Sequence, residues 1–148
     1  MNDPALGLGN RPFTRRKARV AALQALYETD RSLHNPRKTL KRVLDSSSLT
    51  GPTREFAVRL VEGVLENREK TDKIMAALAP AWPVKQIADI DKNILRLAIF
   101  EILESGETPP KVAINEAVDL GKIFGSENSS KFINGVLGSL MEHEQVEA

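Results

Sequence analysis

Apolar residues recur along the chain with the spacing of α-helices, and no segment alternates apolar and polar positions as a half-buried strand does. Residues 1–13 are rich in Gly, Asn and Pro, lack this periodicity and are predicted to form a disordered tail. Helices are predicted from about Thr14 past Tyr27, from Pro36 through Leu44, and as one long helix over residues 53–78. We therefore expect three helices in the first half of the folded region.

The second half is predicted to begin after a proline-rich joint. Pro80 and Pro83 flank Trp82 and cannot continue the preceding helix, so residues 79–87 are predicted to join two subdomains, 14–79 and 84–148. Three helices are predicted after the joint, over residues 89–104, 109–124 and 129–142. The first of them is apolar nearly all round, as a central buried helix should be. The expected fold is a single all-α domain over residues 14–148.

Capping residues place several helix ends. Asn35 followed by Pro36 is typical of an N-cap and a first helical residue. Gly106 and Gly125 each follow a periodic segment, where glycine commonly ends a helix.

Charge is distributed unevenly along the chain. The net charge is only +1, but residues 1–42 hold ten Lys or Arg against three acids, and residues 43–148 hold eleven against seventeen. The corresponding net charges are +7 and −6. This asymmetry indicates a basic surface that binds a polyanion, although a solvated helix face would give the same count.

The densest basic cluster is Arg15-Arg16-Lys17-Ala18-Arg19, which falls in the first turn of the predicted first helix. Cations at a helix N-terminus oppose the helix dipole, so stability alone does not account for them. Helical spacing puts Arg15, Arg16 and Arg19 within an arc of about 100°, while Lys17 points elsewhere. We predict that the three arginines face one phosphate-containing ligand together.

A second candidate segment runs from Phe124 into the last helix. Lys131 and Phe132 follow a polar turn, where an aromatic ring could stack on an unpaired base. Core packing of Phe132 is the competing interpretation. The same segment also resembles a helix-turn-helix, which makes a DNA-binding regulator the alternative function. Apolar residues early in the last helix argue against that alternative, because a recognition helix presents polar side chains there.

Composition narrows the remaining functional classes. The chain has no cysteine, its two histidines are far apart, and it contains no nucleotide-binding glycine motif or HExxH motif. We therefore expect no catalytic residues, no metal and no cofactor, and predict that the protein is not an enzyme. No signal peptide and no run of roughly 18 apolar residues is present, so a cytoplasmic protein that does not enter membranes is expected.

The chain resembles the NusB family of transcription antitermination factors from about Thr14 to Met141. The stretches that carry the resemblance are Arg15-Arg16-Lys17-Ala18-Arg19, Ala22-Leu23-Gln24-Ala25-Leu26-Tyr27, Ile94-Leu95-Arg96-Leu97-Ala98, Lys111-Val112-Ala113-Ile114-Asn115-Glu116-Ala117-Val118 and Lys131-Phe132-Ile133-Asn134-Gly135-Val136-Leu137. The resemblance implies two small helical bundles packed at an angle, without catalytic activity.

The resemblance also implies partners. Proteins of this family pair with the small-subunit ribosomal protein that doubles as NusE, and the heterodimer binds single-stranded boxA RNA in the transcription elongation complex, especially in ribosomal RNA operons. The sequence is compatible with either a monomer or a homodimer when that partner is absent. NusB-like domains are also similar to the amino-terminal region of some RNA cytosine methyltransferases, but 148 residues leave no room for their catalytic domain.

Residue roles follow from the same resemblance. Arg15, Arg16 and Arg19 would contact RNA, and Asn128, Lys131 and Phe132 would complete the RNA-binding site. Tyr27 and Asp91 would lie on the side of the protein partner. Relatives often carry an acid where this chain has Asn128, so stronger intrinsic RNA binding than in an Asn128→Asp variant is expected.

Overall fold

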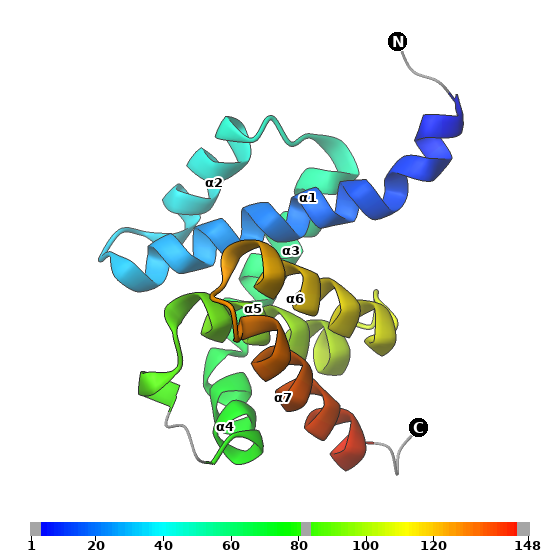
Figure 1. Cartoon of the computed structure of the whole chain (residues 1–148). Coiled ribbons are helices and arrows are strands. Elements are labelled where there is room, and N and C mark those ends of the chain that lie inside the picture. Colours follow the sequence, from blue (N-terminus) through cyan, green and yellow to red (C-terminus); the bar gives the residue numbers. More distant parts are fainter. Residues whose placement is uncertain (1–3, 81–83, 145–148) are drawn as a thin grey trace. The chain divides into compact units, whose positions relative to one another are not determined.

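The structure is a computed structural model that describes residues 4–80 and 84–144. Every regular element within these ranges is helical and none is a strand, which confirms the predicted all-α fold (Figure 1). In chain order the elements are α1 (Pro4–Arg31), α2 (Pro36–Ser46), α3 (Gly51–Glu66), α4 (Arg68–Leu78), the 3₁₀ turn η1 (Val84–Gln86), α5 (Asp89–Phe100), the π-helical turn η2 (Glu101–Ser105), α6 (Pro110–Phe124) and α7 (Ser129–Glu144).

Helix α1 begins earlier than the sequence predicts. The composition of residues 1–13 favours a disordered tail and a helix start near Thr14, whereas α1 begins at Pro4 and residues 1–3 lie outside the described ranges. Lengthening an existing helix needs no new nucleus, so α1 extends through a segment with poor helical composition. The predicted start is wrong, so the basic cluster does not lie in the first turn of the helix.

The predicted long helix over residues 53–78 is two helices. Helix α3 ends at Glu66 and α4 starts at Arg68, with Asn67 between them at φ −104° and ψ 11°. The Asn67 side chain donates a hydrogen bond to the Gly63 carbonyl (2.8 Å), an acceptor in the last turn of α3. Asparagine competes with helical backbone bonding in this way, and the apolar spacing on both sides does not reveal it.

The chain divides into two compact units, residues 1–61 and 62–148, so the division falls within α3. The sequence places it instead at the proline-rich joint, between 14–79 and 84–148. Helix α4 packs against α5 and α7, which makes it part of the second unit. The division therefore does not fall at the proline-rich joint, and Trp82 and Pro83 lie outside the described residues.

In the first unit, α2 packs along α1 (Figure 1). Leu40, Val43 and Leu44 form the buried stripe of α2. Asn35 caps this helix as predicted, because its side-chain oxygen accepts a hydrogen bond from the Arg37 amide (2.8 Å). The stripe leaves the basic residues of α2 on the opposite, outer side.

Helix α5 forms the centre of the second unit and contacts α4, α6 and α7, as expected for a central buried helix. Buried Arg96 donates to both carboxylate oxygens of Asp72 on α4 (2.8 and 2.9 Å) and to the Asn93 side chain (3.2 Å). Buried Glu101 accepts a hydrogen bond from the Thr108 hydroxyl (2.8 Å). Bidentate pairing lets α5 hold a guanidinium inside the unit and fixes α4 beside it.

Close packing of α3 on α5 yields a stability prediction. A Cβ at Gly63 would lie 2.0 Å from the end of the buried Phe100 ring, whereas a Cβ at Gly138 on α7 meets nothing within 4 Å. Overpacking should make Gly63→Ala less stable by about 1–3 kcal/mol. The matched Gly138→Ala should gain up to about 1 kcal/mol from helix propensity. Urea unfolding of both variants tests this, and equal changes would contradict the packing described.

Candidate nucleic-acid interface

The arginines of α1 gather on one aromatic ring of α3. The guanidinium carbon of Arg15 lies 4.5 Å from the centre of the Phe56 ring, that of Arg19 lies 5.3 Å away, and that of Arg59 lies 5.8 Å away. The negative face of an aromatic ring attracts cations. Phe56 thus holds like charges near one another and orders the start of the basic cluster.

Arg19 does not share the exposure of its neighbours. It is only 3% exposed, whereas Arg15 and Arg16 are partly exposed and Lys17 is exposed. Helical spacing explains this, because Leu23 and Leu26 follow Arg19 on the same buried face. The prediction that all three arginines face a ligand together is therefore wrong for Arg19, which lies against Phe56.

The two units carry net charges of opposite sign. Residues 1–61 carry 12 Lys or Arg and 5 Asp or Glu, a net charge of +7. Residues 62–148 carry 9 and 15, a net charge of −6. The first unit as a whole therefore attracts polyanions, and the second needs a more specific site to bind one.

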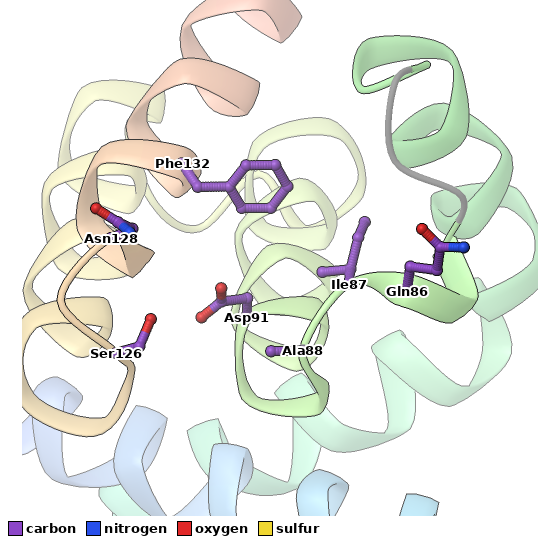
Figure 2. Close-up of a pocket in the computed structure, with 7 residues that line it drawn as sticks. All are labelled: Gln86, Ile87, Ala88, Asp91, Ser126, Asn128 and Phe132. Atoms are coloured by element: carbon purple, nitrogen blue, oxygen red, sulfur yellow. The ribbon is translucent and has the colours of Figure 1, made fainter.

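The second unit has a pocket between the start of α5 and the start of α7. Its volume is about 260 Å³, and it is lined by Gln86, Ile87, Ala88, Asp91, Ser126, Asn128 and Phe132. Figure 2 shows the Asp91 carboxylate turned toward the side of Ser126, and the Phe132 ring extending from α7 toward the side of Ile87. Asn128, Phe132 and Asp91, which the sequence assigns to two different partners, therefore share one pocket.

Asp91 contributes a hydrogen-bond acceptor to this pocket. The residue is 8% exposed, and within the described part of the chain its buried Oδ1 has no hydrogen-bond partner. Its place in the first turn of α5 complements the helix dipole, but the dipole does not supply a donor to Oδ1. A buried carboxylate oxygen without a donor is costly, and a bound N–H group would remove that cost.

A tight turn positions the α7 side of the pocket. The Ser126 amide donates to the hydroxyl of buried Ser129 (2.8 Å), and the Ser129 amide donates to the Ser126 carbonyl (3.1 Å). Glycine is required at position 125, because a Cβ there would lie 2.3 Å from the Ser129 hydroxyl oxygen. This turn sets Ser126 and Asn128 at the rim and directs Phe132 into the pocket.

Two other predicted residues lie outside the pocket lining. Lys131 is exposed on α7 one residue before Phe132. Tyr27 on α1 is half-buried, with the Arg31 guanidinium 5.4 Å from its ring centre. Sequence reasoning missed Phe56, which its spacing assigns to the core, and it missed Ile87 and Ser126, whose contribution depends on how turns fold back.

The helix-turn-helix alternative finds little support in α7. Ile133, Val136 and Leu137 are buried, so this helix is turned into its own unit. No group of three or more His, Asp or Glu residues in the described ranges is placed to hold a metal ion. None of the helices within those ranges has the length and apolar character to cross a membrane.

These features define a class of all-helical proteins that present a basic helical surface together with a small aromatic and acceptor-lined pocket. The chain belongs to the NusB family, whose pattern it matches over residues 16–142. It is 49% identical over 127 residues to the transcription antitermination protein NusB of Dehalococcoides mccartyi, covering 86% of this chain and 89% of the relative. It is 46% identical over 129 residues to the protein of that name from Chloroflexus aggregans, covering 86% of each.

Solved structures agree with this assignment. The chain superimposes on NusB of T. maritima with a TM-score of 0.82 at 31% identity, covering 90% of this chain and 97% of the other. It also matches a chain in the crystal structure of antitermination factors NusB and NusE in complex with dsRNA, with a TM-score of 0.79 at 28% identity, covering 88% and 97%.

The partial exposure of Phe132 predicts that it serves the pocket more than the core. Phe132→Ala should cost less than about 1.5 kcal/mol of unfolding free energy, because the ring is not enclosed. Its neighbour Ile133 is 0% exposed, so Ile133→Ala should cost about 2–5 kcal/mol. Urea unfolding distinguishes the two, and a loss for Phe132→Ala as large as that for Ile133→Ala would make Phe132 a core residue.

Proposed function

We propose that this chain is an RNA-binding adaptor in transcription antitermination. It pairs with a NusE-type ribosomal protein, binds single-stranded boxA RNA and supports transcription of ribosomal RNA operons within the elongation complex. Membership of the NusB family and the match to a NusB chain from a complex with NusE and RNA support this function. The observation that carries it is the pocket in which a half-buried aromatic ring meets a buried acceptor without a donor.

The pocket suits an unpaired base. Phe132 offers a ring face for stacking, which is the usual way in which proteins hold single-stranded RNA. Asp91 Oδ1 can accept a hydrogen bond from the exocyclic amine of a cytosine or adenine. We therefore assign Asp91 to the RNA side together with Asn128 and Phe132, and keep Tyr27 on the side of the protein partner.

The basic cluster on α1 suits the RNA backbone. Arg15 and Arg16 are partly exposed and contact phosphates, while Lys131 adds a further exposed cation beside Phe132. Arg19 acts as a positioning residue, because it is buried against Phe56. Asn128 adds no negative charge near the RNA, so Asn128→Asp should weaken binding.

The adaptor function is tested by titrating a short boxA-like RNA with and without the NusE-type protein. The partner should tighten binding, and Arg15→Ala with Arg16→Ala should weaken it. The double variant should also flatten the salt dependence by up to roughly 0.7 per lost phosphate contact. Lys73→Ala on α4, an exposed lysine of the acidic unit, is the control and should bind as wild type does.

Indifference of RNA binding to both the partner and the double variant would contradict the proposal. Preference for duplex DNA over the single-stranded RNA would favour the helix-turn-helix alternative. Sedimentation of each mixture shows whether the RNA-bound species is a monomer or a homodimer.

A further inference from the structure

Two hollows on the first unit are lined, apart from Arg16, by residues that have no role in the function proposed above. One, of about 430 Å³, lies between α1 and the segment after α2 and is lined in part by Arg16, Lys17, Ser47 and Ser48. The other, of about 360 Å³, lies along α2 and is lined by Lys38, Lys41, Arg42, Asp45 and Ser46. Ser46 lines one hollow and Ser47, the next residue in the chain, lines the other, and we call the two hollows together the α2 groove.

The α2 groove is strongly basic. Five of its lining residues are cations, Arg16, Lys17, Lys38, Lys41 and Arg42, and Asp45 is the one acid among them. On α2 these cations lie opposite the buried stripe, so packing does not account for them. Lys17 lies outside the arc of α1 that holds Arg15, Arg16 and Arg19, and it lines this groove.

We propose that the α2 groove binds the sugar-phosphate backbone of RNA that flanks the boxA element. The inference rests on the proposed function and extends it, because Arg16 belongs both to the basic cluster on α1 and to the groove. A strand held at Arg16 can therefore continue along α2 without leaving the basic surface. From Lys38 to Ser46 the helix offers about 12 Å of further path.

The lining favours an RNA backbone over an acidic protein. Serine hydroxyls and flexible cations are typical phosphate contacts, and none of the lining residues is aromatic, so binding here should not depend on base sequence. Protein interfaces usually have an apolar centre. Val20, Ala21 and Leu49 also line the hollow beside α1, but Ala21 and Leu49 are buried. The exposed large hydrophobic residues of the described ranges, Leu33, Val112, Ile123 and Phe124, do not line the groove.

Existing ion pairs do not block the groove. Lys41 pairs with Asp45 (2.8 Å) and Arg42 pairs with Glu28 (2.7 Å), and all four side chains are substantially exposed. Exposed pairs of this kind are weak, so phosphates can replace the carboxylates. Hydrogen bonds from Lys41 and then Arg54 keep the pKa of Asp45 below its usual range, so Asp45 is charged at neutral pH and competes with RNA.

The test compares a core boxA-like RNA with the same RNA extended by eight uridines at either end. Wild type should bind one extended RNA several-fold more tightly than the core. Lys38→Ala with Lys41→Ala should lose that gain and lower its salt slope by up to about 1.4, at 0.7 per contact, while core binding stays the same. Lys73→Ala with Lys70→Ala, in the acidic unit, is the matched control and should keep the gain.

Asp45→Asn provides a variant whose expected effect is a gain. Removing the competing carboxylate should tighten the extended RNA about two-fold or more and leave the core RNA unchanged, which a merely structural role would not produce. Circular dichroism confirms that each variant is folded.

Failure of the core RNA to bind would defeat the proposed function itself. Core binding without any gain from either extension, or a gain that survives Lys38→Ala with Lys41→Ala, would overturn the groove proposal alone. Loss of NusE-type protein binding in that double variant, with the RNA gain intact, would assign the groove to a protein and would also overturn it.

Discussion

The burial of α5 on nearly every side is the constraint on which the second unit depends. A buried helix must provide partners for each polar group it carries, and α5 does so for Arg96 through Asp72 and Asn93. Within the described ranges only two buried side-chain oxygens have no hydrogen-bond partner, Asp91 Oδ1 and Glu28 Oε2. Buried polar atoms without a hydrogen-bond partner are found most often at functional sites. Asp91 lies in the first turn of α5 and lines the pocket.

In the first unit, positively charged side chains lie close to one another. Its net charge of +7 is spread over α1, α2 and α3, and part of it converges on the Phe56 ring. A π-face stabilises cations without neutralising them, so the charge remains available to a polyanion. Acidic residues would have served stability equally well but would have reduced that attraction. In the proposed function, the first unit would supply general attraction for RNA and the second unit specific recognition.

The sequence predicted the helix ends that depend on a single capping or glycine residue. Asn35 caps α2, Gly106 adopts φ 69° after η2, and α6 ends before Gly125, each as its residue type predicts. The break at Asn67 escaped prediction because one hydrogen bond to Gly63 interrupts an otherwise continuous apolar stripe. The start of α1 at Pro4 and the assignment of α4 to the second unit also depend on the fold around them.

The candidate site, too, was predictable only in the parts that depend on local sequence. Spacing singled out the basic cluster, because its residues are contiguous in sequence. Spacing alone favoured core packing of Phe132, and its predicted role in RNA binding came from the resemblance to the NusB family. Spacing did not reveal that Arg19 is buried, since a residue at the rim of an apolar stripe can lie inside or outside it. Spacing also did not predict that Asp91 and Phe132 line one pocket, because this requires the start of α5 to lie near the start of α7.

The central claim is that RNA binds to exposed arginines of the basic cluster on α1 in the first unit and to the pocket in the second unit. Nuclear magnetic resonance of labelled protein titrated with boxA-like RNA and the NusE-type partner tests it most directly. We expect the Arg15 and Arg16 guanidinium signals, the Asn128 side-chain amide and the Phe132 ring all to shift when the RNA is added. Shifts confined to one unit would contradict the claim.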